Sequence, residues 1–254
     1  MNNIYHTVVI GGGCLGVASA ISLARKIDSN KNTQNVCILE KSVLAGGISS
    51  RHSGIIRSAN ASIQAATFAE EANSMWRNIH EYWGIGIKPE QPGAIWIAKN
   101  DNKESAKTWI DLEKKLKKSN IDFSKINSKE IKSLTNNLIR IDEKKEIYFH
   151  EPNAMLFDPL KVRNVMYSAL EINKVKLKEN TRVIDFELQS GNKIKKIRTN
   201  HGTIFAENII NAAGGWSPQI FDSIGIKIPV SLQPVYVSNW LVSKKKLPKN
   251  FPII

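Results

Sequence analysis

Near the N-terminus, the apolar positions change their spacing twice within forty residues. Residues 5–10 are rich in β-branched side chains, which is typical of a buried strand. Residues 14–27 then carry apolar side chains at helical spacing, and residues 36–39 form a second apolar run that ends at Glu40. This order predicts a strand, a helix and a second strand, which together make a βαβ unit.

Further along the chain, several stretches favour helices. In residues 62–83, apolar side chains recur every three or four positions and predict a core-facing helix: Phe68, Ala72, Met75, Trp76, Ile79 and Trp83. Residues 103–118 predict an amphipathic helix, and Ser128 opens a short helical turn. Asp158 and Pro159 mark a further helix start, because an acid caps free N–H groups and proline suits the first helical position.

The remaining apolar runs are short and predict strands. They cover residues 93–98, 174–178, 182–188, 193–199, 203–206 and 208–211, with turns at 191–192 and 201–202. Trp216, Ser217 and Pro218 begin another helix by the same pattern of cap and proline, and residues 230–242 predict a long strand. Residues 41–60 show no clear period.

The turn after the first strand has the spacing Gly-x-Gly-x-x-Gly at Gly11, Gly13 and Gly16. Gly11 permits a tight turn, Gly13 lets the backbone approach a pyrophosphate, and Gly16 lets the helix pack closely on the strand. The helix start offers unpaired N–H groups and a positive dipole end to phosphates. Glu40 can accept hydrogen bonds from a ribose. Because strand, helix and acid all stand where the motif requires them, we predict a dinucleotide site.

The same apolar stretch does not fit a signal peptide or a membrane span. No Lys or Arg precedes Arg25, so the basic segment that opens a signal peptide is absent. Three adjacent glycines interrupt residues 8–24, and the stretch is shorter than the ~20 residues that a span needs. We therefore expect a soluble chain without a membrane span.

Charge and cysteine content change this picture little. The net charge of +13 is typical of proteins that bind nucleic acid or membranes. Here the basic residues are interleaved with acids, as in residues 111–118, so we expect a solvated helix face and no nucleic-acid partner. A basic funnel for an anionic substrate remains open.

The two cysteines, Cys14 and Cys37, are too few for a disulfide framework, and we expect both to be reduced in the cytoplasm.

Together, the motifs of the chain resemble those of the FAD-dependent oxidoreductases of the D-amino-acid oxidase superfamily, in its sarcosine oxidase and dimethylglycine dehydrogenase branch. The resemblance covers almost the whole chain. It rests on the glycine turn with Glu40-Lys41, residues 46–57, Glu151-Pro152 with residues 157–159, Thr181-Arg182-Val183, and residues 211–217. The glycine turn alone does not separate flavin from nicotinamide enzymes, whereas residues 211–217 look like a flavoprotein pattern.

The resemblance implies a binding site for FAD and no metal site. Gly11, Gly13 and Gly16 would hold the pyrophosphate, with Cys14 and Leu15 completing the turn. Glu40 would bind the adenosine ribose beside Lys41, and Val183 would meet the adenine through its backbone. Ser49, Ser50 and Arg51 would line the flavin end, and Ala213 and Gly214 would let the chain run close to the cofactor. The other implied cofactor residues are His52 and Trp216.

Two residues are candidates for catalysis. In the dimethylglycine dehydrogenase branch, a histidine at the position of His52 carries FAD covalently; the alternative is a polar residue that only hydrogen-bonds in a cofactor loop. Arg57 matches an arginine near the flavin ring in sarcosine oxidases. Its guanidinium would stabilise reduced flavin or bind a substrate carboxylate, and the apolar pair Ile55-Ile56 before it indicates a buried approach.

The expected fold is α/β, with a Rossmann-like FAD-binding domain (residues 1–88 and 150–229) interleaved with an α+β substrate domain (residues 89–149 and 230–254). The expected function is FAD-dependent oxidation of the C–N bond of a secondary or tertiary amine, such as an N-methylated amino acid. The alternatives are a flavin-linked 2-hydroxy-acid dehydrogenase and an inactive FAD-binding fragment.

Members of this family extend well beyond the position that corresponds to Ile254. The substrate domain is therefore expected to be incomplete, with a second chain or a missing C-terminal half completing the fold. We expect the chain alone to be a poor enzyme, because the strand predicted at residues 230–242 would lack its later partners.

Overall fold

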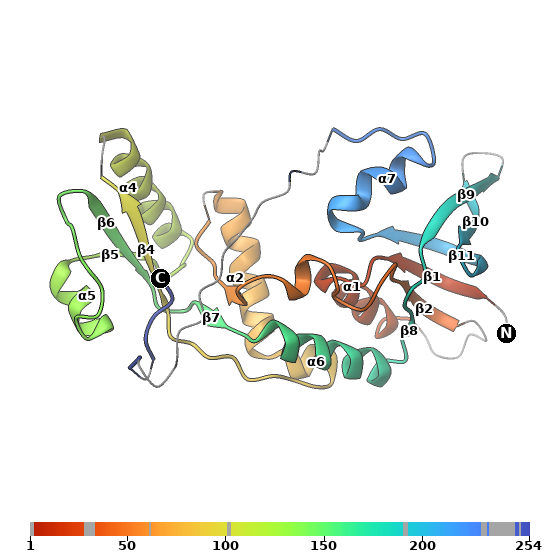
Figure 1. Cartoon of the computed structure of the whole chain (residues 1–254), viewed down its shortest axis with the longest axis horizontal. Coiled ribbons are helices and arrows are strands. Elements are labelled where there is room, and N and C mark those ends of the chain that lie inside the picture. The colour runs from red at the N-terminus through yellow and green to blue at the C-terminus, as the bar shows by residue number, and fades with distance from the viewer. Residues whose placement is uncertain are drawn as a thin grey trace. The chain divides into compact units, whose positions relative to one another are not determined.

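The computed structural model describes residues 3–27, 34–60, 62–100, 103–189, 193–229, 233, 247–248 and 250–254 (Figure 1). The chain divides into two compact units. Unit 1 comprises Met1–His52, Ile79–Ile87 and Pro159–Val237, and unit 2 comprises Ser53–Asn78, Lys88–Asp158 and Ser238–Ile254. These bounds differ from those of the predicted domains, mainly because residues 53–78 and 150–158 fall in unit 2. The assignment of a cofactor domain and a substrate domain stays a prediction.

Within the described residues, unit 1 is built on a six-stranded sheet with the order β8-β2-β1-β11-β10-β9. β8 (Lys176–Lys178), β2 (Gln34–Leu39), β1 (Ile4–Ile10) and β11 (Gly202–Asn211) run parallel to their neighbours. β10 (Lys193–Thr199) and β9 (Val183–Gln189) continue the sheet antiparallel. Because β1, β2 and β11 are parallel neighbours, their carboxyl ends lie together at one edge, the usual place for a ligand in such a sheet.

The helices of unit 1 pack on this sheet. α1 (Cys14–Ala24) contacts β1, β2 and α6 (Pro159–Ile172) through small and branched residues, of which Val17 and Ala20 are fully buried. α3 (Ile79–Trp83) is tied to the same unit, because the Asn173 side chain donates to the Trp83 carbonyl at 2.8 Å. Two short 3-10 turns, η1 (Ile48–Ser50) and η2 (Gly214–Trp216), and the helix α7 (Ser217–Asp222) complete the unit. No helix in the described part of the chain is long and apolar enough to cross a membrane.

Unit 2 contains a three-stranded antiparallel sheet, β4 (Ala94–Lys99), β6 (Glu146–Glu151) and β5 (Ser124–Ile126), in the order β4-β6-β5. Ile253 pairs with Ala94 on the other side of β4. The described part of this unit has three helices: α2 (Ile63–Arg77), α4 (Lys103–Lys118) and α5 (Ser128–Thr135). A short antiparallel pair joins β3 (Ile55–Ile56) to β7 (Met155–Leu156).

Aromatic rings dominate the core of unit 2. Phe123 and Phe149 are fully buried and stack with ring centroids 5.1 Å apart. Trp109 stacks on Phe149, and Trp96 packs against Trp109 at 6.0 Å. Each such pair adds to the stability that area burial alone provides. The core therefore holds Trp96 on β4 in a defined orientation, although its side chain is only half-buried.

The α/β class is confirmed, and most predicted elements are found within a few residues of their expected bounds. α4 has the predicted limits, whereas residues 62–83 form two helices that break at Asn78, and residues 203–206 and 208–211 form one strand, β11. The strands β3, β5, β6 and β7 were not predicted. The turn at 191–192 and, apart from residue 233, the strand expected at 230–242 lie outside the described residues.

The predicted core face of the first of these two helices is wrong at Phe68, whose side chain is 73% exposed, and at Ala72, which is exposed as well. The buried residues of α2 are instead Ala66 and the polar Asn73. Asn73 is buried because its amide hydrogen-bonds to the Ser58 hydroxyl, so a polar contact replaces the apolar one that periodicity favoured.

His150 on β6 gives unit 2 a dependence on pH. Burial lowers the pKa of His150 below its ordinary value of 6.5, against the opposing effect of Asp122, Glu130 and Glu151. The unfolded chain therefore binds a proton more readily, and stability present above the ordinary pKa is lost as the pH falls. We expect the free energy of unfolding to fall less between about pH 7 and pH 5 in His150→Asn than in the wild type, measured by urea unfolding. The exposed His80→Asn is the control, and equal pH slopes in His150→Asn and the wild type would contradict the expectation.

Candidate functional site

The turn between β1 and α1 is closed by contacts that only glycine allows. Gly11 has a φ of +108°, and a Cβ there would lie 2.4 Å from the Ala212 carbonyl oxygen, at the end of β11. A Cβ on Gly16 would lie 1.9 Å from the Gly11 carbonyl oxygen. Both distances are far below van der Waals contact, so these two glycines allow the turn, the helix and β11 to meet. This geometry agrees with the packing roles expected from the sequence.

Gly13 differs from the other two glycines. A Cβ on Gly13 would meet only the Ser49 hydroxyl oxygen, at 3.1 Å, so packing does not require glycine there. The Cys14 N–H donates to Ser49 Oγ at 3.0 Å. Within the described residues, the N–H groups of Gly13, Leu15 and Gly16 have no hydrogen-bond partner, and α1 has no acidic residue in its first turn. This helix end can therefore accept an anion such as a phosphate.

Glu40 braces the turn from the neighbouring strand. Its carboxylate accepts from the Gly12 N–H at 2.8 Å and from the Ser42 N–H at 2.9 Å. A carboxylate has further lone pairs, so these bonds leave room for a ribose hydroxyl, and that role stays a prediction. The Glu40 carbonyl accepts from the Thr181 N–H at 2.8 Å, which brings the segment before Val183, the first residue of β9, to the same edge.

The predicted segment around Trp216 lies beside the segment after β2. Lys41 Nζ is 3.5 Å from the centroid of the Trp216 ring, a cation–π contact, and a Cβ on Gly47 would be 3.8 Å from the same ring. The Asn211 side chain accepts from the Ala213 N–H and the Ser217 hydroxyl. Gly214 has a φ of +58° with no atom within 4 Å of a built Cβ, so its backbone conformation, rather than crowding within the protein, favours glycine.

The structure also places the three residues that follow Ser49. Ser50 is half-buried, and Arg51 and His52 are exposed. His52 Nε2 lies 3.1 Å from the Ser49 carbonyl oxygen, so the histidine ring is held next to the residue that contacts α1. Unit 1 thus brings together most of the predicted cofactor residues, and their contacts with a cofactor stay predictions.

Arg57 belongs to unit 2, and its surroundings differ from the expectation. Ile55 and Ile56 are half-buried as β3, but the Arg57 side chain is exposed, so the buried approach is wrong. The guanidinium lies over the Trp96 ring, 4.6 Å from its centroid, and donates to the Ala59 carbonyl. This arrangement fixes one face of the guanidinium and leaves the group accessible to an anion.

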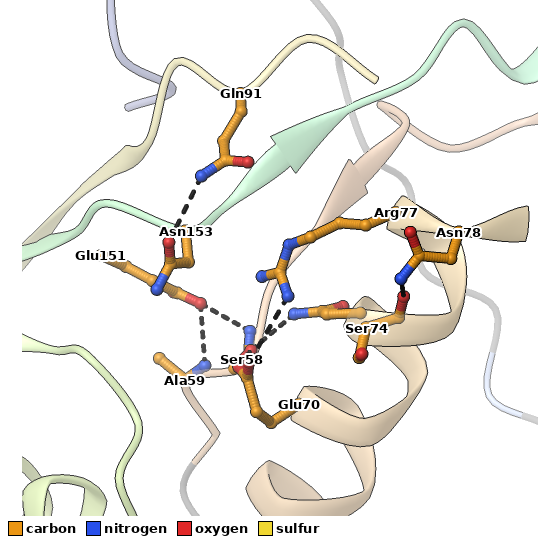
Figure 2. A network of polar contacts seen from close by, with 10 residues as sticks. Ser58, Ala59, Glu70, Ser74, Arg77, Asn78, Gln91, Glu151 and Asn153 are labelled. Carbon is orange, nitrogen blue, oxygen red and sulfur yellow. Dashed lines mark hydrogen bonds and ion pairs between the residues drawn. The ribbon is translucent and has the colours of Figure 1, made fainter. Parts of the chain in front are cut away.

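Two acidic residues were not assigned a role from the sequence. Glu179 accepts from the Leu44 N–H at 2.6 Å and from the Tyr167 hydroxyl, and so fixes the segment after β2 in unit 1. Glu151 in unit 2 is 1% exposed and accepts from the Ser58 and Ala59 N–H groups, as Figure 2 shows. The motif Glu151-Pro152 was the available signal for Glu151, but its partners are more than ninety positions away in sequence.

Comparison with known families gives one match over nearly the whole chain. The family model described as "FAD dependent oxidoreductase" matches residues 6–253. The chain is 25% identical to sarcosine oxidase subunit beta from Arthrobacter sp. over 242 residues, which are 91% of this chain and 56% of that protein. It is 25% identical to human mitochondrial dimethylglycine dehydrogenase over 258 residues, which are 98% of this chain and 28% of that protein. The resemblance that the motifs indicated is therefore confirmed.

A solved structure shares the fold. The crystal structure of L-proline dehydrogenase from P. horikoshii superposes with a TM-score of 0.78 at 24% sequence identity, covering 89% of this chain and 57% of that one. The chain thus spans little more than half of this structure and of the sarcosine oxidase subunit, and a smaller share of dimethylglycine dehydrogenase.

The contacts of the three glycines predict different costs of substitution. We expect Gly16→Ala to lower the free energy of unfolding by more than the ~1–3 kcal/mol of ordinary overpacking, because the new methyl overlaps a backbone carbonyl. Gly13→Ala meets one hydroxyl and should cost less than about 1 kcal/mol. Urea unfolding of both variants is the measurement. Equal losses in the two would show that α1 does not pack on the turn in this way.

Proposed function

The chain belongs to the family of FAD-dependent oxidoreductases, and from this premise we propose that it binds FAD through unit 1 and serves the oxidation of an amine. The substrate class that we propose is a secondary or tertiary amine with a carboxylate, such as an N-methylated amino acid. The observation that carries the proposal is the start of α1, where three N–H groups have no partner among the described residues, beside a glycine that packing does not require.

The residues of unit 1 fit the cofactor. The end of α1 would receive the pyrophosphate at Gly13, Leu15 and Gly16, since their N–H groups are unpaired within the described residues. Glu40 would bind the adenosine ribose with the lone pairs that its two backbone contacts leave. The loop at Ser49 is already bonded to α1 and would extend toward the flavin end.

The chemistry follows from this cofactor and from an anchoring group. When bound, FAD supplies an acceptor for the hydride that leaves the C–H bond next to the amine nitrogen. The amine nitrogen shares its lone pair with the same carbon, so the product is an iminium ion. When the substrate is a secondary amine, this ion loses its N–H proton to give an imine. Water hydrolyses either form to an amine and a carbonyl compound. Arg57 would hold the substrate carboxylate with the planar fork of its guanidinium. One face of the same guanidinium lies against the Trp96 ring.

The names of the relatives support the amine class over the 2-hydroxy acids. Sarcosine and dimethylglycine are a secondary and a tertiary amine with a carboxylate, and proline is a cyclic secondary amine of the same kind. Whether substrate bleaches the bound flavin separates the proposal from a role as an FAD-binding subunit without turnover.

A titration with FAD followed by substrate addition tests the proposal. We expect the purified chain to bind FAD, and Gly13→Val to bind it far more weakly while unfolding at a similar urea concentration. Under exclusion of oxygen, sarcosine or dimethylglycine should bleach the flavin absorbance. Bleaching by 2-hydroxyglutarate instead would favour the hydroxy-acid alternative, bound FAD without any bleaching would favour the non-catalytic role, and no FAD binding would refute the assignment of unit 1.

Arg57→Lys keeps the positive charge but loses the planar fork. We expect kcat/KM for an N-methylated amino acid to fall by about tenfold or more, mainly through KM, because a bidentate contact with the carboxylate becomes a single one. The exposed Arg140→Lys is the matched control in unit 2. Steady-state kinetics that are equal for Arg57→Lys and the wild type would remove Arg57 from the site.

A further inference from the structure

We infer that Glu151 is a positioning residue for Arg57, and that its buried carboxylate sets the direction in which the guanidinium meets an anionic substrate. The inference rests on the proposed function of Arg57 and extends it to a residue that makes no contact with the substrate. All the residues concerned belong to unit 2.

Arg57 has two supports. Its guanidinium donates to the Ala59 carbonyl, and the face of the group lies 4.6 Å from the centroid of the Trp96 ring. The first contact fixes one edge of the guanidinium, and the second fixes its plane. Together they leave the opposite edge and face for a ligand, so the direction of recognition depends on where Ala59 and Trp96 are held.

Glu151 holds both supports. One carboxylate oxygen, Oε1, accepts from the Ser58 N–H at 2.5 Å and from the Ala59 N–H at 3.1 Å. The other, Oε2, accepts from Trp96 Nε1–H at 3.0 Å. A single side chain thus binds the backbone that carries the Arg57 acceptor and the indole on which Arg57 lies.

Burial makes this arrangement rigid. Glu151 is 1% exposed, so its hydrogen bonds do not compete with water, and hydrogen bonds to a charged acceptor are stronger than those between neutral groups. A buried carboxylate without these donors would be costly, which favours one geometry of the network. An anion would then meet a guanidinium that is already oriented, and less rotamer freedom would be lost on binding.

The side chain of Ser58 makes a separate set of contacts. Figure 2 shows Glu70 and Arg77 of α2 beside Ser58, and these two side chains form an ion pair. The Ser58 hydroxyl donates to Glu70, and the Asn73 amide bonds to the same hydroxyl. Glu70 touches neither Arg57 nor Trp96 in these contacts. It therefore offers a matched control, a carboxylate of the same network that does not hold the supports of Arg57.

Glu151→Gln changes this network in a defined way. In one orientation, the oxygen of the new amide accepts from the Ser58 and Ala59 N–H groups, and its NH2 group faces the Trp96 N–H. In the flipped orientation, the oxygen accepts from Trp96, and the NH2 group faces the two backbone N–H groups. One set of donors loses its acceptor in either orientation. Trp96→Phe removes the indole donor while it keeps an aromatic face under Arg57. Combining it with Glu151→Gln therefore removes the clash between the amide NH2 group and the indole N–H.

The test measures how strongly the FAD-loaded chain prefers a carboxylate over an uncharged analogue. The probes are methoxyacetate and methoxyacetamide, in which an ether oxygen replaces the amine nitrogen, and the readout is the change of the flavin absorption spectrum on titration. We expect Glu151→Gln to reduce the carboxylate preference by about tenfold or more. Glu70→Gln should leave it unchanged, and the double variant of Glu151→Gln with Trp96→Phe should be no worse than Glu151→Gln alone.

The outcomes separate this inference from the proposed function. Arg57→Met should abolish the preference; if it does while Glu151→Gln keeps the wild-type ratio, the inference is wrong and the role of Arg57 stands. If Arg57→Met keeps the preference, the proposed role of Arg57 fails. Should Glu151→Gln not fold, Trp96→Phe alone must reduce the preference for the inference to hold. In the flavin-free chain, the indole N–H NMR signal that Trp96→Phe removes must shift in Glu151→Gln, and an unshifted signal would contradict the network itself.

Discussion

The architecture of unit 1 depends on the close approach of three backbone segments at the end of β1. The carbonyl of Ala212 and the carbonyl of Gly11 stand where side-chain carbons at positions 11 and 16 would otherwise be. This approach sets the distance between α1 and the parallel strands β1 and β11. Two hydrogen bonds need that distance to be short: the Gly12 N–H donates to the Glu40 carboxylate, and the Cys14 N–H at the start of α1 donates to Ser49 Oγ. The candidate anion site is thus a consequence of how tightly the backbone packs.

Unit 1 could be predicted well from the sequence because its information is local. The glycine spacing, the apolar run before it and the acid after β2 fall within forty residues, and each has a fixed meaning in a βαβ unit. The pairing of β1 with β11 joins residues about two hundred positions apart, yet residues 211–217 carried a motif of their own. Even so, the sequence did not indicate that the Glu40 carboxylate accepts hydrogen bonds from the Gly12 and Ser42 N–H groups.

Unit 2 was less accessible to prediction, for identifiable reasons. β6 carries acids at both ends and a histidine within it, which hides its apolar alternation. The face of α2 that is buried holds Asn73, while Phe68 is exposed, because the partner of that face is the polar segment at Ser58. The role of Glu151 depends on Ser58 and Trp96, which are far from it in the chain, and no spacing rule reports such a contact. The recognition proposed for unit 1 would use main-chain groups that a motif specifies, whereas the recognition proposed for Arg57 would use side chains that only the folded chain brings together.

The two cysteines give the protein a built-in chemical asymmetry. Cys37 lies within β2, where burial raises the pKa of its thiol to about 11, so almost none of it is thiolate at neutral pH. Cys14 is half-buried at the first position of α1, next to the glycines of the turn. An alkylating reagent therefore discriminates between the two sulfurs in the folded state and modifies the one at the turn first. A fluorophore attached there would sit beside the candidate anion site and report on its occupancy, without any engineered cysteine.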